Sequence, residues 1–244
     1  NLMIESSREL DWRECRMISF FQKLVWLYRG GYLLRDFKNI TRYGYFEAPR
    51  AFEQISINPS LVKESVTNPW TREHSALVID GDWDLLKRRQ IQNLPKVKMC
   101  KAHFEDGLSW EKTGIIDYAT RRIKRQGKCD DCMSVDDVIQ RYNNLDELYS
   151  TLKVGQPFLP QSKLFENSIR EKGGIIIHVG RNRELLFGGG GHHRLAIAQI
   201  LKLDEIPAQL GVIHAQAMGE DLMCGLRRGL HPSKQCHVMK KSIV

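Results

Sequence analysis

One stripe of apolar residues predicts a long amphipathic helix in the second half of the chain. Ser134 and Asp137 have the capping-box spacing that opens a helix, and Gly155 and Pro157 mark its end. Between these signals, apolar residues recur at steps of four and three: Val138, Tyr142, Leu145, Tyr149 and Leu152. This is the spacing of one helical face, so we expect the stripe to face the core.

Short apolar runs bounded by turn residues predict strands. They lie at 52–57, 75–84, 174–180, 185–187 and 206–213. The turn "RNRE" places the third and fourth runs in a hairpin, and the run at 75–84 passes from a short buried strand into a polar turn. After the fourth run come four glycines and a second helical segment, in which Ile197, Ala198 and Leu201 share a face.

The remaining segments carry weaker signals. Ser6 and Glu9 open a predicted first helix that runs to Leu27, and two glycines at 30 and 31 end it. Residues 85–128 are charged and irregular, with one predicted helix at 110–123.

Composition is that of an ordinary globular chain with a basic balance. The 244 residues are 42% hydrophobic and 27% charged, and the formal net charge is +8. A basic surface favours polyanions or phosphorylated ligands. No apolar run reaches the roughly 20 residues that cross a bilayer, and six irregularly spaced cysteines do not suggest a secreted disulfide scaffold. These features predict a cytoplasmic protein, with a viral source as the alternative.

The stretch "FGGGGHHR" carries the main candidate chemistry. Gly188, Gly189, Gly190 and Gly191 join a strand to a helix start, where unpaired N–H groups and the helix dipole attract anions. His192, His193 and Arg194 follow in the first turn, and an arginine can grip a phosphate with two N–H groups. We expect His192 to be exposed, and His193 either to contact phosphate or to tie the loop to the core. The alternative is a glycine-rich turn with solvated basic residues.

The segment "FGGGGHHRLAIAQILKLDEIPAQL" resembles the signature of the ParB/sulfiredoxin-like superfamily. The pieces "ISINPSLV" (55–62) and "LDELYSTLKVG" (145–155) are similar to further family elements, in the same order. The resemblance implies an α/β fold: a small mixed-sheet ParB/sulfiredoxin-like domain at 49–216. An N-terminal helical extension (1–48), an insertion at about 82–134 and a basic C-terminal tail (217–244) would enlarge it.

In that superfamily the glycine turn binds nucleotide phosphates. The resemblance therefore implies backbone contacts from Gly189, Gly190 and Gly191, side-chain contacts from His193 and Arg194, and ATP, ADP or CTP with Mg²⁺ as ligand. Two positions depart from the pattern. His192 stands where sulfiredoxins have their catalytic cysteine, and Gly190 stands where many members have aspartate. The first departure argues against reduction of a sulfinic acid by the sulfiredoxin route. The second argues against any reaction that needs the aspartate carboxylate.

Two cysteine-containing pairs have zinc-ligand spacing. Cys100 and His103 form a C-x-x-H pair, and Cys129 and Cys132 form a C-x-x-C pair. Together they could supply a Cys3His zinc site, and free cysteines in a loop are the alternative.

A run of basic residues suggests a second kind of ligand. The run at 121–128 contains Arg121, Arg122, Lys124, Arg125 and Lys128. It fits either a solvated helix end or a nucleic-acid contact. A basic tail follows near the C-terminus: Arg227, Arg228, Lys234, Lys240 and Lys241.

Acidic turns and apolar histidines complete the candidates. Turn formation is the leading explanation of the acidic residues, and a Mg²⁺ ligand or general base is the alternative for one of Asp80, Asp82, Asp84, Glu105 and Asp106. His178 and His214 lie in apolar strands and are predicted to be packed, and core roles are expected for Trp83 and Trp110.

The sequence therefore predicts a protein that binds a nucleotide or a phosphorylated small molecule, with phosphoryl transfer or nucleotide hydrolysis as an extension. The alternatives are a nucleic-acid-binding module and an inactive structural or assembly protein.

Overall fold

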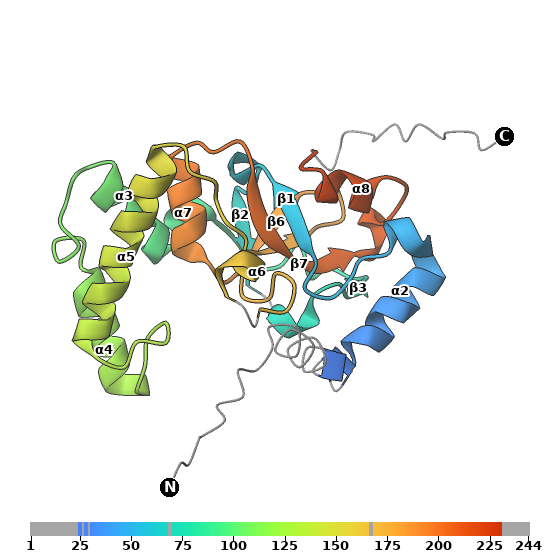
Figure 1. Cartoon of the computed structure of the whole chain (residues 1–244), viewed down its shortest axis with the longest axis horizontal. Coiled ribbons are helices and arrows are strands. Elements are labelled where there is room, and N and C mark those ends of the chain that lie inside the picture. The colour runs from blue at the N-terminus through green and yellow to red at the C-terminus, as the bar shows by residue number, and fades with distance from the viewer. Residues whose placement is uncertain (1–23, 26, 29, 68–69, 166–167, 231–244) are drawn as a thin grey trace, which may run out of the picture.

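A computed structural model describes residues 24–25, 27–28, 30–67, 70–165 and 168–230 (Figure 1). The fold is α/β, as the sequence predicts: helices surround one mixed sheet. Its strands are β1 (Gln54–Ile57), β2 (Glu64–Val66), β3 (Val78–Ile79), β4 (Arg88–Gln90), β5 (Ile176–Val179), β6 (Leu185–Gly189) and β7 (Ile206–His214). Its helices are α2 (Tyr32–Glu47), α3 (Pro95–Phe104), α4 (Ile115–Gln126), α5 (Val135–Lys153), α6 (Gln161–Leu164), α7 (His192–Ile200) and α8 (Leu222–Arg227).

The sheet has the order β1-β7-β5-β6-β2-β4, and β3 pairs with the far end of β7. The strand pairs β5–β7 and β2–β6 are parallel, as is β3–β7, and the remaining pairs are antiparallel. The predicted hairpin of the runs at 174–180 and 185–187 is confirmed by the antiparallel β5–β6 pair. In the β2–β6 pair, Ser65 lies opposite Phe187, so the carboxyl ends of both strands reach the same edge.

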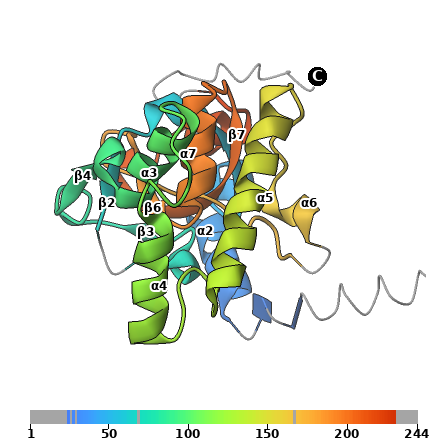
Figure 2. The same cartoon turned by 90° about the vertical axis from the view of Figure 1, so that its left-hand side faces the viewer.

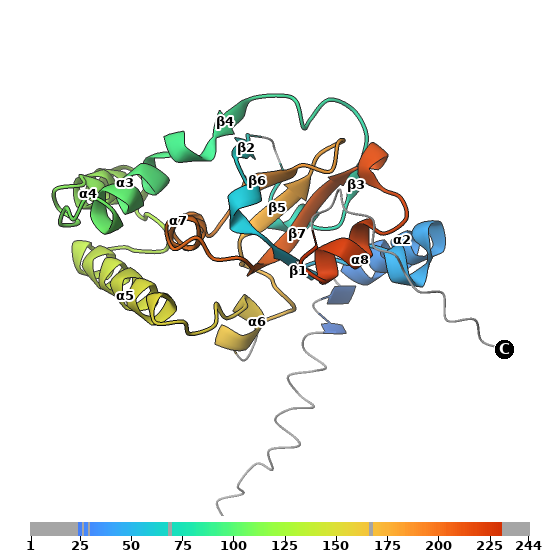
Figure 3. The ribbon, with the colours of Figure 1, turned by 90° about the horizontal axis from the view of Figure 1, so that it is seen from above.

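The main core lies on the face of the sheet that α7 covers. Figure 3 shows α7 between the sheet and the group of α3, α4 and α5. Ile177, Phe187 and Leu210 from the sheet meet Leu195 and Ile197 of α7 in this core, and all five are fully buried. A smaller cluster of Val66, Trp83, Leu186 and Val212 forms a separate packing centre. The alternation of Leu186 and Phe187 between the two clusters follows from the period of two in a strand.

Helix α5 confirms the predicted stripe. The capping box of Ser134 and Asp137 is present, with the Asp137 N–H donating to Ser134 Oγ at 3.1 Å. Val138, Tyr142 and Leu152 are buried against the main core. Figure 2 shows α3 and α7 beside the upper part of α5, with α4 below α3.

The segment 85–128 is more regular than its sequence suggests. It adds β4 to the edge of the sheet and contains α3, which the sequence analysis missed. The predicted helix at 110–123 begins at Ile115 instead, because Gly114 adopts a left-handed conformation (φ 79°) immediately before it. The run at 75–84 was predicted to be a buried strand, but β3 has two half-buried residues.

Several predictions fall at the ends of the chain. Most of the predicted first helix lies outside the described residues, although Leu24, Val25, Leu27 and Tyr28 are helical. The first part of the segment predicted to be a basic tail forms α8, whose Leu222, Met223 and Leu226 are buried. Within the described residues, no helix has the length and apolar character needed to cross a bilayer.

Candidate functional site

The glycine loop adopts a backbone that favours glycine. Gly189, Gly190 and Gly191 have φ of 97°, 70° and 60°, a region that residues with a Cβ rarely enter. A Cβ on Gly191 would lie 2.7 Å from Ile175 Cγ1, and one on Gly190 would lie 3.2 Å from the carbonyl oxygen of Gly174. Conformation and space therefore both exclude larger residues from the end of the loop.

Helix α7 starts without a side-chain cap. Its N-cap is Gly191, which offers no side chain to accept from the first N–H groups. The first backbone hydrogen bond of the helix runs from Leu195 N–H to Gly191 O at 2.9 Å. The N–H groups of residues 192–194 have no acceptor within the helix, and they carry the positive end of the helix dipole.

A cavity of about 240 Å³ lies beside this helix start. It is found at the carboxyl ends of the parallel strands β2 and β6, the edge at which open α/β sheets bind ligands. Its lining combines backbone, hydroxyl and imidazole groups with apolar surface: Ser65, Val66, Thr67, Leu94, Phe187, Gly188, Gly189 and His192. The loop that the sequence singled out therefore borders a cavity, together with residues of β2 that the sequence did not suggest.

A second helix start borders the same cavity. Leu94, which lines it, is the N-cap of α3, and this helix also lacks a side-chain cap. Pro95 occupies the first position of α3, where its missing N–H costs no hydrogen bond. Two uncapped helix N-termini therefore meet at one cavity, and their partial positive charges add.

Lys96, in the first turn of α3, brings a full positive charge to this region. Its Nζ forms an ion pair with the Asp130 carboxylate. Helix α3 packs against α7, and after burial the charge of Lys96 is the next cause that lowers the pKa of both His192 and His193. Sequence analysis did not select Lys96, and the Leu94-Pro95 step before it, typical of a helix start, is the signal that could have done so.

His192 is half-buried instead of exposed, which corrects the expectation from its place at the loop mouth. Its ring packs edge-on against Phe187, with the centroids 4.7 Å apart. Burial, followed by repulsion from Lys96, lowers its pKa to about 4. At neutral pH the ring is therefore uncharged and can donate or accept one hydrogen bond at the cavity.

His193 points into the core, the second of its two expected roles. It is 5% exposed, and its Nε2 lies 3.0 Å from the Tyr142 hydroxyl of α5. Burial lowers its pKa to about 3, so the ring is neutral. A direct phosphate contact from this side chain is incompatible with that position, and His193 instead ties α7 to α5.

Arg194 also departs from its predicted role. Its Nη1 donates to Gln161 Oε1 at 3.0 Å, and its guanidinium lies 4.5 Å from the Phe158 ring centroid. Because successive helical residues turn by about 100°, Arg194 lies roughly 200° around α7 from His192, which lines the cavity. The predicted two-pronged grip on phosphate is therefore not formed, and Arg194 holds the segment after α5.

The four predicted zinc ligands do not converge. His103 lies 2.9 Å from Asp146 Oδ1 and stacks on Trp110 at 3.8 Å, while Cys100 is buried within α3. Burial raises the pKa of the Cys100 thiol to about 12 and that of Cys129 and Cys132 above its usual value, which opposes the thiolate form that metals require. Among the described residues, no group of three or more His, Cys, Asp or Glu side chains could hold a metal.

The acidic turn at 80–84 is structural. Asp84 is fully buried, and it accepts from the Arg181 guanidinium at 2.8 Å and from the Arg181 backbone N–H at 2.9 Å. Hydrogen bonds and the charge of Arg181 outweigh burial and hold the pKa of Asp84 below its usual value. His214 lies beside this turn, with Nε2 2.8 Å from the Gly81 carbonyl oxygen. The alternative of a metal ligand or base at the cavity does not hold for Asp84.

The other predicted core residues are packed. His178 and His214 are fully buried, and Trp83 and Trp110 are 8% and 6% exposed. Trp110 Nε1 donates to Asp146 at 3.0 Å. Glu105 and Asp106 are exposed at the carboxyl end of α3, at the opposite end from the cavity.

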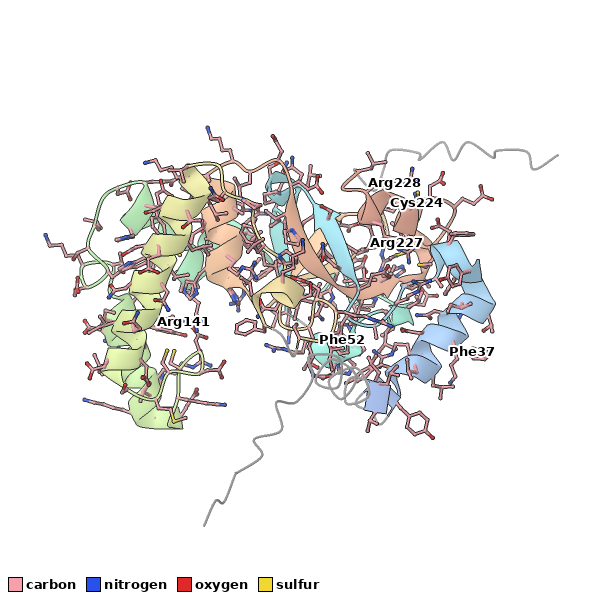
Figure 4. The ribbon with its side chains drawn as sticks, viewed as in Figure 1. Phe37, Phe52, Arg141, Cys224, Arg227 and Arg228 are labelled. Carbon is pink, nitrogen blue, oxygen red and sulfur yellow. The ribbon has the colours of Figure 1, made fainter. Side chains whose placement is uncertain are left out.

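The basic run forms the exposed face of α4 and the residues that follow it. Arg121, Lys124, Arg125 and Lys128 are exposed, whereas Arg122 is half-buried and donates to Tyr118 Oη at 3.0 Å. Arg227, the last residue of α8, forms an ion pair with Glu53 at 2.6 Å and donates to the carbonyl oxygen of Ala48, just after α2, at 2.8 Å (Figure 4). Lys234, Lys240 and Lys241 lie outside the described residues.

Comparison of the chain with protein-family models, with curated proteins and with solved structures gave no match.

Proposed function

We propose that this protein binds the phosphate group of a phosphate ester, such as a nucleotide, in the cavity between β2, β6 and the starts of α3 and α7. The observation that carries the proposal is that two uncapped helix N-termini border one cavity. Each offers unpaired N–H donors and about half a positive charge, the combination that binds anions in many folds. A single N-terminus would be weaker evidence, because most helices are merely solvated there.

The other groups at the cavity suit the same ligand. Ser65 and Thr67 bring hydroxyls, and Gly188 and Gly189 let a ligand approach the backbone closely. Lys96 does not line the cavity, but it follows Leu94 by two residues and would add a full charge by exchanging Asp130 for the ligand. The volume of about 240 Å³ is below the roughly 300–1,000 Å³ of sites that enclose a drug-sized ligand. The cavity therefore fits the phosphate end of an ester, with the remainder outside.

The resemblance to the ParB/sulfiredoxin-like superfamily supports phosphate binding by the loop backbone, but the side chains differ from that expectation. His193 and Arg194 are engaged with Tyr142 and Gln161, so Lys96 and the two hydroxyls take their place in the proposal. The proposal is limited to binding. Asp84, the buried carboxylate of the acidic turn, is paired with Arg181 away from the cavity, so no residue is assigned as a general base.

The test is calorimetric titration of the full chain with ATP, ADP and CTP, with and without Mg²⁺, and with adenosine as the phosphate-free control. Thr67 is exposed at the cavity, so Thr67→Glu adds a carboxylate there without disturbing the core. We expect Thr67→Glu to abolish binding by repulsion, and Thr67→Gln, which has the same size and no charge, to retain it. Heat from adenosine equal to that from ATP, or equal binding by both variants, would contradict the proposal.

A second pair of variants tests the assignment of the cation. Lys96→Met should weaken phosphate binding at least about tenfold, because a charge-assisted hydrogen bond contributes about 1.5–3 kcal/mol. Lys98→Met removes an exposed lysine from the same helix and should bind like the parent. If both variants bind equally well, Lys96 has no part in the site.

The exposed face of α4 favours a second candidate function, nucleic-acid binding. Arg121, Lys124, Arg125 and Lys128 form no ion pair with any other described residue, and α4 projects beyond the sheet (Figures 1 and 2). Binding to duplex DNA should fall steeply with salt, since each neutralised phosphate contributes a slope of about 0.9. The double variant Arg121→Gln and Arg125→Gln should reduce that slope by about two, whereas Lys163→Gln, at an exposed lysine within α6, should not. A flat salt dependence would exclude this function.

A further inference from the structure

Helix α2 buries two polar residues beside Tyr32 and leaves large apolar residues exposed. Asp36 and Asn39 are 6% and 9% exposed. Leu34 and Phe37, on the opposite side of the helix, are 58% and 63% exposed. Apolar side chains on a surface helix normally face the core, so this reversal requires a physical cause and has a consequence for binding.

The cause lies in hydrogen bonds that hold the polar face inward. Asn39 Nδ2 donates to the carbonyl oxygens of Pro49 at 2.8 Å and Ala76 at 3.0 Å. Asp36 accepts from the Ala51 N–H at 2.7 Å and from the Arg170 guanidinium at 2.8 Å. Rotating the helix to bury its apolar side would leave all these buried groups unpaired. The exposed position of Leu34 and Phe37 is therefore fixed by the fold.

The outer face of α2 carries a net positive charge. We define this face by Leu34, Phe37, Lys38, Thr41 and Arg42, of which Lys38 and Arg42 are charged. These residues fall within about 140° of one another around the helix, and all five are exposed.

The acidic residues of α2 do not balance Lys38 and Arg42. Asp36 is buried, and Glu47 accepts from the Met223 N–H at 3.0 Å. Beyond the kink at Gly44, Tyr45 and Phe46 add exposed aromatic surface, with 61% and 80% of their area accessible.

We propose that the outer face of α2 docks onto an anionic lipid surface. Exposed aromatic and aliphatic side chains beside lysine and arginine, without acidic residues, are the composition of helices that lie in a membrane interface. Self-association through this face would bring Lys38 and Arg42 of two copies together, which like charge opposes.

The position of α2 suits such a surface. The helix forms one end of the molecule, opposite the end formed by α3, α4 and α5, and Phe37 points outward from it (Figures 1 and 4). A helix on the outside of the molecule can lie flat on a membrane. The phosphate cavity faces a different part of the fold, so lipid docking and phosphate binding are independent proposals.

The test is sedimentation of the full chain with vesicles of phosphatidylcholine alone and of phosphatidylcholine mixed with phosphatidylserine. We expect binding to the anionic vesicles that weakens with added salt. Phe37→Ser should weaken it at least about tenfold through lost apolar burial, and Arg42→Gln about fivefold. Val154→Ser removes an exposed apolar side chain, 76% accessible, from the opposite end of the molecule and should bind like the parent.

Two results would overturn this inference. The first is the absence of binding to anionic vesicles, or equal binding by the Phe37→Ser and Val154→Ser variants, because another part of the chain would then be responsible. The second is a dimer in analytical ultracentrifugation that Phe37→Ser dissociates, because a second copy would then cover the face. Circular dichroism melts of each variant establish that it is folded.

Discussion

Helices α5 and α2 are of similar length and lie at opposite ends of the molecule, yet α5 buries a continuous apolar stripe whereas α2 buries two polar residues beside Tyr32. Helix α5 packs Val138, Tyr142 and Leu152 against the main core. Helix α2 packs Asp36 and Asn39 inward and leaves Phe37 in solvent. The hydrophobic effect orients the first helix, while hydrogen bonds to buried backbone groups orient the second.

The difference shows that an apolar stripe identifies the face of a helix that gains from burial. It does not identify what buries that face. At α5 the cover is the rest of the fold. At α2 the inner side meets a loop whose carbonyl oxygens and N–H groups need partners, namely those of Pro49, Ala51 and Ala76. Asn39 and Asp36 on the polar side of α2 supply these partners. Leu34 and Phe37 on its other side stay exposed.

The largest expected effect is on the α5 side. Leu152→Ala should lower the free energy of unfolding by about 2–5 kcal/mol, the range for removing a buried leucine side chain from a packed core. Ile139→Ala, on the outer side of the same helix and 43% exposed, serves as the control and should change it by less than about 1 kcal/mol. Urea denaturation measures both. Equal losses would mean that α5 does not present the face assigned to it.

The next largest effect concerns a buried polar residue of α2, where an apolar replacement should destabilise the protein. Asn39→Leu would improve the helix if hydrophobic burial oriented it. We expect instead a loss of about 1–3 kcal/mol, because the carbonyl oxygens of Pro49 and Ala76 lose their donor inside the protein. Thr41→Leu on the outer face is the matched control and should be nearly neutral. A gain in stability from Asn39→Leu would refute this explanation of the helix orientation.

The sequence predicted those parts of the fold whose signals are local. The α5 stripe, its capping box and the β5–β6 hairpin depend on residues close together in the chain. Helix α3 escaped prediction because Lys96, Lys98 and Lys101 interrupt its apolar pattern, and its start was marked by Pro95 alone. The orientation of α2 depends on contacts such as Asn39 with Ala76, 37 residues along the chain, which no local pattern reveals.

The candidate site was predictable in its backbone and not in its side chains. Positive φ at Gly189, Gly190 and Gly191 follows from the four consecutive glycines. The destination of Arg194 does not, because the helix turn and the position of Gln161 decide it. The place of Thr67 beside the loop does not follow either, because the pairing of β2 with β6 brings this distant segment there. The Leu94-Pro95 step could have indicated a helix start at Lys96, but only the packing of α3 against α7 brings that start to the loop.

A smaller effect links α7 to α5 through pH. The pKa of His193 falls from 6.5 to about 3 on folding, so the unfolded chain binds the extra proton. Its contribution to stability is therefore complete above about pH 6.5 and declines as the pH falls toward 3. The variant His193→Gln keeps every carboxylate of the parent, so the titration of these groups cancels in a comparison of the two. Between about pH 6 and pH 5, the free energy of unfolding of the parent should therefore fall by about 1 kcal/mol more than that of His193→Gln. Urea titrations at the two pH values measure this difference, and parallel pH profiles would contradict the burial of a neutral ring.

The smallest expected effect on stability separates the two helices most clearly. Phe37→Ser removes a large aromatic side chain, a change that costs several kcal/mol inside a core. On α2 the ring already contacts mainly solvent, at 63% exposure, so we expect a change of less than about 0.5 kcal/mol. Val138→Ser at the buried face of α5 is the matched comparison and should be strongly destabilising, since it leaves a cavity and a buried hydroxyl. If Phe37→Ser proved as costly as Val138→Ser, the outer face of α2 would already be covered in the free protein, and it would not be available to a partner.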